Sequence, residues 1–285
     1  MPDHHIIIFV LLITYQFQWV RVGGSLSWVD SGIDLLVGIS KHRIYMRTGM
    51  SAKKHTGVGW KRIPGGLMQI STFGPHLWGV NKSHSIWVGS FLGGDGNKRW
   101  GKGKVVHKRH YHKMVRRWSY RFGGWRRIGG ALMRISCGRM GIWGVNKAHH
   151  IYYWAGGWKR YAGALVDISS GGHEIWGVNK AHQIYRRRGK GGWKRIPGRL
   201  QQVSVSQRDH VWGIWKQKIY RWTGKKWVRI GGGLQMVDVG PSGVWGCNKA
   251  QQIWHQKSTY GDLKNHNGSG VSFQVDFTYA RVFTI

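Results

Sequence analysis

Runs in which apolar and polar residues alternate recur along most of this 285-residue chain. Residues 67–71 are Leu-Met-Gln-Ile-Ser, and equivalent runs begin at Leu132, Leu165, Leu200 and Leu234. A period of two is typical of a half-buried β-strand. Three further short segments, Trp-Gly-Val-Asn, Ile-Tyr and Trp-Lys-Arg-Ile, recur in the same order with glycine-rich turns between them. The pattern therefore predicts an all-β protein built from four-stranded units.

The units repeat at a nearly constant interval. An opening tryptophan occurs at positions 60, 125, 158, 193 and 227, the last four are separated by 33, 35 and 34 residues, and a weaker copy opens at Trp19. Four short antiparallel strands in a repeat of this length form one blade of a β-propeller. We expect a propeller of about six four-stranded blades over residues 19–255. The alternative, a β-sandwich with chance similarity, is disfavoured by five near-copies of the repeat.

Three segments fall outside this pattern. Residues 89–122 occupy the space of about one extra repeat, so they are either a long basic insertion in a six-bladed ring or a decayed seventh blade. Residues 1–18 contain an apolar run, 6–14, that is too short to span a bilayer as a helix and suits a signal-peptide remnant or a closing strand equally well. Residues 256–285 contain an alternating run, 271–279, that could pair with an N-terminal strand and close the ring.

Charge and composition narrow the class of function. The chain has 45 Lys and Arg against 10 Asp and Glu, a formal net charge of +35, which favours binding to polyanions. Glu174 is the only Glu, so a hydrolase with two facing carboxylates is disfavoured. The chain has neither a Gly-x-Ser-x-Gly nucleophile motif nor a phosphate-binding glycine loop. The three His in 107–112 lie among cations that oppose a divalent metal. We expect a protein that is not an enzyme and has no cofactor or metal.

The blade pattern is similar to that of a known family. Trp-Lys-Arg-Ile-Pro-Gly-x-Leu-x-Gln-Ile-Ser, followed by Trp-Gly-Val-Asn-Lys and Ile-Tyr, resembles the tectonin repeat of fish-egg lectins and tachylectin-type lectins, over roughly residues 19–255 without 89–122. The resemblance implies a secreted, non-enzymatic β-propeller that binds N-acetylated sugars or bacterial lipopolysaccharide in eggs or innate defence. The chain departs from the family after the Asn, where it has Lys-Ser-His, Lys-Ala-His or Lys-Ala-Gln instead of acidic or neutral residues.

Tryptophan and asparagine of the second strand are the first candidates for binding. Aromatic rings stack on the apolar face of a sugar, and an Asn amide can donate and accept hydrogen bonds to hydroxyl or acetamido groups. We therefore expect carbohydrate contacts from Trp78, Asn81, Trp143, Asn146, Trp176, Asn179, Trp245 and Asn248. The alternative is that the Trp rings pack between blades and the Asn residues serve their turns. Trp212 precedes a shorter turn without Asn, so its blade is expected to have the weakest site.

Basic residues also recur at fixed positions of the repeat and would form rings on a propeller. They are Lys82, Lys147, Lys180 and Lys249 after the second strand and Arg62, Arg127, Arg160, Arg195 and Arg229 in the fourth strand. Such rings suit repetitive polyanions: lipopolysaccharide phosphates, heparin-like glycans or nucleic acid. The alternative is that the fourth strand is the outer edge of each blade, where charged side chains discourage edge-to-edge pairing.

Two functions follow from these observations. The first is a secreted lectin for glycans or lipopolysaccharide, with shallow repeated sites between blades. The second is a non-catalytic scaffold that binds polyanions through its Lys and Arg rings. Binding to nucleic acid would be nonspecific, because no recognised nucleic-acid-binding module is present. The sequence predicts no transmembrane segment and leaves the oligomeric state open.

Overall fold

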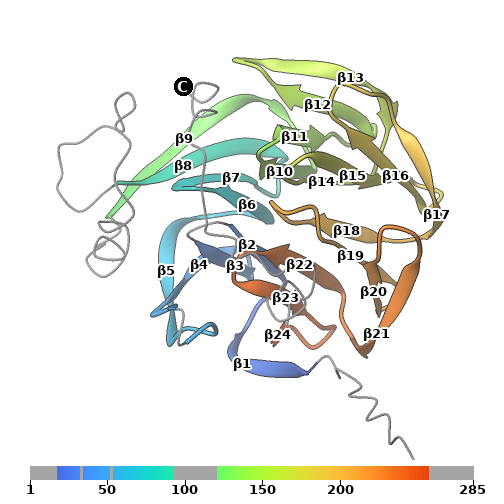
Figure 1. The fold of residues 1–285 in the computed structure, drawn as a ribbon. Coiled ribbons are helices and arrows are strands. Elements are labelled where there is room, and N and C mark those ends of the chain that lie inside the picture. Colours follow the sequence, from blue (N-terminus) through green and yellow to red (C-terminus); the bar gives the residue numbers. More distant parts are fainter. Residues whose placement is uncertain (1–17, 33–34, 52–53, 93–120, 257–285) are drawn as a thin grey trace, which may run out of the picture.

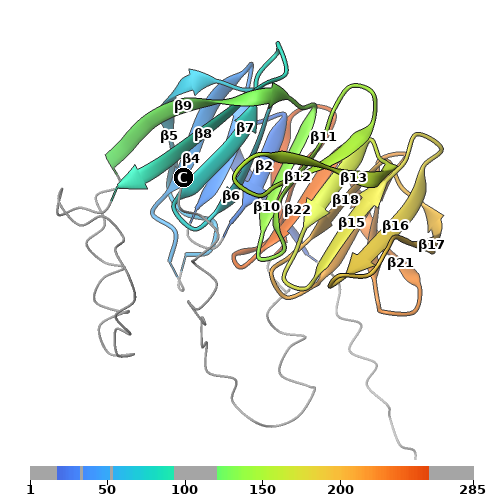
Figure 2. The same cartoon turned by 90° about the horizontal axis from the view of Figure 1, so that it is seen from above.

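The described residues form a closed ring of β-sheets. The structure is a computed structural model that describes residues 18–32, 35–51, 54–92 and 121–256, and their strands form six four-stranded sheets (Figure 1). Each sheet is one blade, and its strands are ordered from the centre of the ring to the rim. Figure 2 gives the view of the same ring turned by 90°. The predicted all-β propeller of about six four-stranded blades is confirmed.

Five blades are continuous in sequence. Blade I contains β2 (Trp28–Ser31), β3 (Leu36–Ser40), β4 (Arg43–Thr48) and β5 (Gly59–Gly66). Blade II contains β6 (Gln69–Phe73), β7 (His76–Val80), β8 (Ser85–Leu92) and β9 (Arg121–Ala131). Blade III contains β10 (Arg134–Gly138), β11 (Gly141–Val145), β12 (His150–Trp154) and β13 (Trp158–Ala164). Blade IV contains β14 (Asp167–Ser170), β15 (Glu174–Val178), β16 (Gln183–Arg188) and β17 (Lys194–Arg199). Blade V contains β18 (Gln202–Val205), β19 (Val211–Trp215), β20 (Lys218–Trp222) and β21 (Trp227–Gly233).

Blade VI joins the two ends of the described chain. Its three inner strands are β22 (Met236–Gly240), β23 (Gly243–Cys247) and β24 (Gln252–Gln256), and its outer strand is β1 (Trp19–Ser25). β1 pairs with β24 in antiparallel register, with Val22 opposite Ile253, and the two strands lie side by side in Figure 1. The weak N-terminal copy of the repeat therefore supplies the fourth strand of the last blade. The runs 6–14 and 271–279, predicted as closing strands, lie outside the described residues.

The flanks of the basic segment predicted at 89–122 are strands of one sheet. Phe91 lies opposite Phe122, and Leu92 lies opposite Arg121, in the β8–β9 pair. These flanks are the third and fourth strands of blade II, which has its own complete set of four. Residues 93–120 between them, which include the three clustered His, lie outside the described residues.

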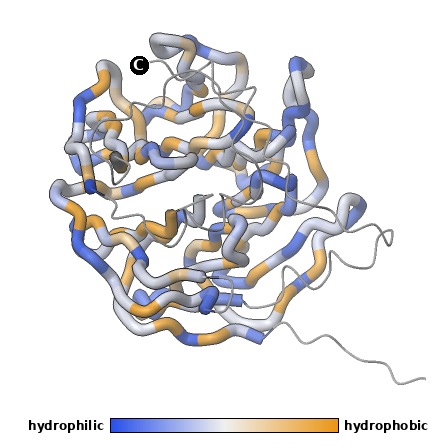
Figure 3. The backbone as a smooth tube through the Cα atoms, turned by 60° about the vertical axis from the view of Figure 1, so that its left-hand side comes forward, coloured by the Kyte–Doolittle hydropathy of each residue, from blue (hydrophilic) through white to orange (hydrophobic). Residues whose placement is uncertain are grey.

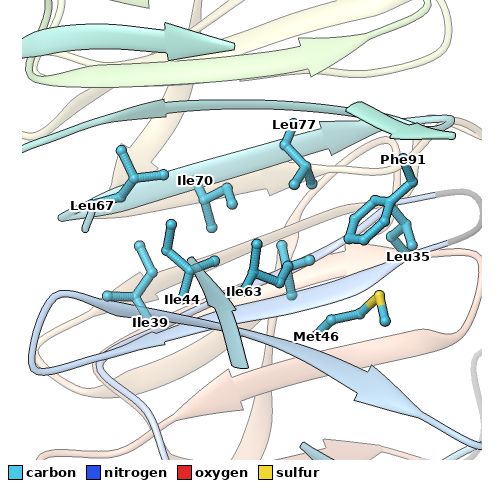
Figure 4. Packing of buried hydrophobic residues seen from close by; sticks show 10 residues of the cluster. Leu35, Ile39, Ile44, Met46, Ile63, Leu67, Ile70, Leu77 and Phe91 are labelled. Carbon is cyan, nitrogen blue, oxygen red and sulfur yellow. The ribbon is translucent and has the colours of Figure 1, made fainter. Parts of the chain in front are cut away.

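The hydrophobic core is divided among the blade interfaces. At the interface of blades I and II, Ile39, Ile44 and Ile63 of blade I face Leu67 and Ile70 of blade II (Figure 4). Hydrophobic and hydrophilic positions are interspersed along the strands (Figure 3), as the alternating sequence pattern requires. Each blade can therefore present apolar side chains to its neighbours while its outer strand keeps polar side chains in solvent.

A close approach explains the glycine that follows the second-strand tryptophan. A Cβ atom at Gly144 would lie 2.4 Å from Leu132 Cδ1 and 2.8 Å from the backbone oxygen of Arg134. The equivalent leucine makes the same approach to the equivalent glycine in the other five blades. The Leu that enters a blade and the Gly of its second strand therefore form one packing unit, and both recur in the repeat.

Polar side chains of the inner strands tie each blade to the next. Gln69 of blade II donates to the Ile135 carbonyl of blade III and accepts from the Ile135 N–H. At the closing interface, Asp238 of blade VI accepts from the Ser31 N–H of blade I at 2.7 Å. The cavity that these strands enclose measures about 20 Å³, which is room for about one water molecule. The axis of the ring is therefore too narrow for a sugar.

Candidate functional site

The tryptophans predicted to bind sugar lie inside the ring. Trp78, Trp143, Trp176 and Trp245 are each at most 4% exposed, and Trp212 is fully buried. They pack against aromatic residues of neighbouring strands; the rings of Trp78 and Trp158, for example, have centroids 6.2 Å apart and lie nearly perpendicular. A ring enclosed on all sides cannot stack on a sugar. The structure therefore does not support sugar contacts at these four positions and places them in the packing between blades.

The predicted asparagines hold the turns between the second and third strands. Asn146 Oδ1 accepts a hydrogen bond of 2.8 Å from the His150 N–H, and the Asn146 N–H donates to the His150 carbonyl at 3.1 Å. Between them, His149 has a φ of 65°, in the left-handed region. The same turn occurs at Asn81, Asn179 and Asn248. These Asn residues shape the turn, and they are half-buried.

Each of these turns presents a lysine to solvent. The predicted Lys82, Lys147, Lys180 and Lys249 are all exposed, directly after the Asn. Because the connections between second and third strands of all blades emerge on the same side of a propeller, these lysines share one face of the ring. The following residues are small and exposed: Ser83, Ala148, Ala181 and Ala250.

Blades I and V make the same connection with a shorter turn. Lys41 and His42 have φ angles of 46° and 64°, and Lys216 and Gln217 have 47° and 64°, as in a type I′ hairpin turn. Lys41 and Lys216 are exposed. Sequence reasoning missed both, because these turns lack the Asn that marks the others; a Lys directly after a predicted strand was the available signal. We call the six lysines and the turns that carry them the lysine face.

Each fourth strand carries an exposed arginine opposite a half-buried aromatic residue. The predicted Arg62, Arg127, Arg160, Arg195 and Arg229 are exposed, and Arg21 of β1 is the sixth member of the set. The residues directly opposite on the third strands are Tyr45, Trp87, Tyr152, Tyr185 and Tyr220, with Trp254 opposite Arg21. Opposite residues of antiparallel strands project from the same face of the sheet. Sequence reasoning missed these aromatic residues as site candidates, although Ile-Tyr or Ile-Trp recurs in every repeat.

The aromatic–arginine pair projects toward the neighbouring blade. Trp60 lies two residues before Arg62, so both project from the same face of β5. Trp60 Nε1 donates to the Gly23 carbonyl of blade VI at 2.9 Å. The equivalent tryptophans Trp19, Trp125, Trp193 and Trp227 make the same bond to the outer strand of the preceding blade. We call each pair, with this Trp, an interblade strip.

The strip of blade IV also contains amide groups. Asn179 Nδ2 donates to Gln183 Oε1 at 2.9 Å, and the Tyr185 hydroxyl donates to the same oxygen at 3.0 Å. Gln183 lies opposite Arg199, and Tyr185 lies opposite Arg195. An amide, a phenol and two guanidinium groups therefore follow one another along one face. Two residues predicted as separate candidates, Asn179 and Arg195, belong to the same strip.

The acidic side chains of the described residues are buried or paired. Asp30, Asp167 and Asp238 line the axial cavity; Asp30 and Asp167 are buried, and Asp238 is half-buried. Glu174 is also buried and accepts hydrogen bonds from Trp176 Nε1 and from the Arg188 guanidinium. Asp209 accepts from the His173 ring at 2.8 Å. The described surface is therefore dominated by cations.

The axial carboxyl groups hold their protons more tightly than usual. Burial raises the pKa of Asp167 and of Asp238 to about 6. Burial, and after it the nearby Asp238, raises the pKa of Asp30 well above its usual value. Each carboxyl nevertheless accepts hydrogen bonds from an adjacent blade, such as the bond of 2.9 Å from the Val203 N–H to Asp167. These groups are part of the ring's internal structure and lie apart from the strips.

Comparison with known proteins agrees with this architecture. Among solved structures, a chain in the crystal structure of a mitotic checkpoint complex is 7% identical, covers 90% of this chain and 99% of its own, and has a TM-score of 0.53. This likeness shows the propeller fold alone. The described residues contain no helix that is long and apolar enough to cross a membrane.

Sequence relatives identify the family of this chain, which the likeness in fold does not. Tectonin-2 of Physarum polycephalum is 42% identical over 65 residues, and Tectonin-1 of the same organism is 43% identical over 65 residues. These matches cover 22% of this chain but only 18% and 30% of the two relatives. The model of the tectonin domain matches residues 8–106, 101–156, 153–218 and 215–269, which together span most of the chain. This protein therefore belongs to the tectonin family.

Proposed function

We propose that this protein is a non-enzymatic lectin that binds N-acetylated sugars or bacterial lipopolysaccharide through its interblade strips. The observation that supports the proposal is the sixfold recurrence of an exposed Arg directly opposite a half-buried aromatic residue at the blade interfaces. Membership of the tectonin family adds to it. A role in innate defence and a secreted location are part of the same proposal.

The chemistry of a strip suits a sugar ring. The aromatic face can pack on the apolar C–H face of a pyranose, while Arg donates to hydroxyl, carboxylate or phosphate oxygens. In blade IV, Asn179 and Gln183 add amide groups beside Tyr185, and amides can both donate to and accept from an acetamido group. Four blades carry the Asn turn. Their strips would therefore have an additional amide group for hydrogen bonds to a sugar, which the strips of blades I and V lack.

Repeated weak sites would give useful avidity on a repetitive surface. A second contact made by a molecule that is already bound occurs at high effective concentration, so the overall affinity can exceed that of one site by about 10²–10⁴-fold. A bacterial surface coated with identical glycans is such a target. Shallow strips around a rim suit this mode of binding better than one deep pocket, and the axial cavity of about 20 Å³ offers no alternative site.

A second candidate function, nonspecific polyanion binding, is favoured by the exposure of the six lysines and six arginines. The two candidates differ in their response to salt and to free sugar. Binding to a lectin site is competed by sugar and survives salt, whereas binding to a charge ring ignores neutral sugar and falls steeply with salt.

A pair of matched variants distinguishes the two functions. Arg160→Ala with Arg195→Ala removes two strip residues, whereas Lys159→Ala with Lys194→Ala removes the same charge from exposed neighbours on the opposite face of the same strands. We expect retention on immobilised N-acetylglucosamine, eluted by the free sugar, to fall for the Arg variant and to persist for the Lys variant. Equal loss in both, with retention on heparin reduced in parallel, would favour polyanion binding and contradict the lectin.

A further inference from the structure

Six lysines lie on one face of the ring, one for each blade. The backbone conformation of each turn fixes the position of its lysine. Two backbone hydrogen bonds close each of the four Asn turns. The Asn N–H donates to the carbonyl of the residue four positions later at 3.0–3.1 Å. The Asn backbone carbonyl accepts from the N–H of the residue three positions later at 2.9 Å. The hairpin turns of blades I and V place Lys41 and Lys216 equivalently, with both residues of each turn in the left-handed region. The turns are four residues long in four blades and two residues long in blades I and V, and all six carry their Lys on the same face of the ring.

Neighbouring side chains leave these lysines free to contact an external surface. The residues that follow Lys in the four Asn turns are Ser or Ala, so the Lys is the longest side chain at the tip of each turn. The acidic groups of the described residues lie elsewhere: three line the axis, and Glu174 and Asp209 are at the opposite ends of the inner strands. A face with cations at the tips of its turns and no exposed carboxylate among the described residues is complementary to an anionic surface.

Two apolar side chains lie inside the lysine ring. Met68 and Met133 are 43% and 38% exposed, and both follow the buried Leu at the connection into a blade. The Met68 N–H donates to the Val80 carbonyl and the Met133 N–H to the Val145 carbonyl, at the base of the Asn turns. They therefore project on the same side as Lys82 and Lys147. Flexible thioether side chains at this place can enter the headgroup layer of a lipid surface while the lysines contact phosphates.

We propose that the lysine face docks flat on an anionic phospholipid bilayer. The geometry favours a membrane over a polyanionic chain, because six cations on one face of the ring can contact a surface simultaneously, whereas a flexible chain can contact only the lysines along its path. The strip arginines lie on the fourth strands at the rim, whereas the amide end of the blade IV strip, Asn179, directly precedes Lys180 and belongs to the lysine face. The proposal does not depend on sugar binding by the strips.

Sedimentation with lipid vesicles tests the proposal. The vesicles contain phosphatidylcholine alone or phosphatidylcholine mixed with phosphatidylserine. One variant combines Lys147→Ala, Lys180→Ala and Lys249→Ala. A matched variant with the same loss of charge combines Arg160→Ala, Arg195→Ala and Arg229→Ala.

The lysine variant is expected to bind the vesicles much more weakly than the arginine variant. Because a lysine near an anionic membrane contributes about fivefold to binding, the Lys variant should lose about 100-fold in partition to the phosphatidylserine vesicles, and the Arg variant only a few-fold. Met68→Ser with Met133→Ser should reduce partition by a few-fold without changing its dependence on phosphatidylserine.

Three results would overturn the proposal. The first is no preference of the unmodified protein for vesicles with phosphatidylserine. The second is an equal loss in the Lys and Arg variants, which would mean that only net charge matters. The third is an equal loss of heparin retention and vesicle binding in the Lys variant, which would assign the face to polyanions of any shape. Thermal unfolding of each variant checks folding, and retention on immobilised N-acetylglucosamine reports separately on the strips.

Discussion

Blades IV and V have the same outer pair of residues but different turns. Tyr185 lies opposite Arg195 in blade IV, and Tyr220 lies opposite Arg229 in blade V. Blade IV connects its second and third strands through the four-residue Asn179 turn, whose amide reaches Gln183. Blade V uses a two-residue hairpin turn, Lys216 and Gln217, and has Lys218 where blade IV has Gln183. The turn, which supplies Asn179, and the first residue of the third strand, Gln183, therefore decide together whether a strip contains amide groups.

The exposed lysine is independent of this difference. Lys180 in blade IV and Lys216 in blade V are both exposed although their turns differ in length. At the interface of these two blades, the His182 ring of the longer turn packs on Trp215 beside the shorter one, with centroids 4.9 Å apart. The two turn types thus fit against each other in one face. The comparison separates a variable feature, the amide, from a feature present in all six blades, the lysine.

The largest expected effect concerns the second-strand tryptophans that the two blades share. Trp176→Ala and Trp212→Ala should each lower the free energy of unfolding by about 3–5 kcal/mol, because each removes a fully buried ring. Tyr185→Ala should cost much less stability and reduce sugar retention, because that residue is half-buried in a strip. Chemical denaturation measures the first quantity. A Trp176→Ala protein of unchanged stability that had lost sugar binding would contradict the buried placement of this ring.

The second prediction compares the inner strands, where blade IV has Asp167 and blade V has Gln202. Both side chains accept a hydrogen bond from the next blade, but only Asp167 can ionise. Its folded-state pKa of about 6 lies above the usual value, so its protonated form is favoured in the folded protein. The corresponding stability is fully present below the unfolded-state pKa and is lost as the pH rises through about 6.

Asp167→Asn removes this pH dependence. Relative to the variant, the unmodified protein should gain about 2–3 kcal/mol of stability as the pH falls from about 7.5 to about 4. The other ionisable groups are the same in both proteins, so their contribution cancels in the difference. Urea denaturation at several pH values measures it. A constant difference between the two proteins would show that folding does not raise the pKa of Asp167.

The smallest expected effect concerns the turns themselves. Asn179→Ala removes the bond of 2.9 Å from the Gln183 N–H and the bond of 2.9 Å to Gln183 Oε1, and it should cost about 1 kcal/mol while weakening sugar retention. The matched change in blade V, Gln217→Ala, should change neither quantity, because this side chain is exposed and is not part of a strip. Equal effects on sugar binding would remove the distinction between the two blades.

Several features of the fold follow from local sequence alone. The alternating runs, the repeating Trp and the glycine-rich turns determine the strands and the four-stranded blade, but they leave six or seven blades open, and the structure has six sheets in the described residues. The prediction that Arg62 and its equivalents lie on an outer edge strand is also local, because it follows from the order of strands within one repeat. The family resemblance rests on the same repeated residues and agrees with the match to the tectonin domain.

The sites were less predictable because they depend on neighbouring blades. Trp176 and Tyr185 are both aromatic residues of alternating strands, yet one is fully buried and the other half-buried. Their exposure is decided by how far each strand lies from the axis, since inner strands are covered on both faces and outer strands diverge. Lys41 and Lys216 show a similar limit, because their equivalence to Lys180 follows from their place in the ring and not from a shared motif.

The sequence by itself determined the repeat, the strand order within a blade and the excess of positive charge, because each depends on residues close together in the chain. Only the tertiary structure decided which strand closes the ring, with Val22 opposite Ile253. It also decided which aromatic rings remain accessible and which lysines share one face of the ring. These features depend on contacts between blades, and the free energy of such contacts comes from surfaces that a single repeat does not contain.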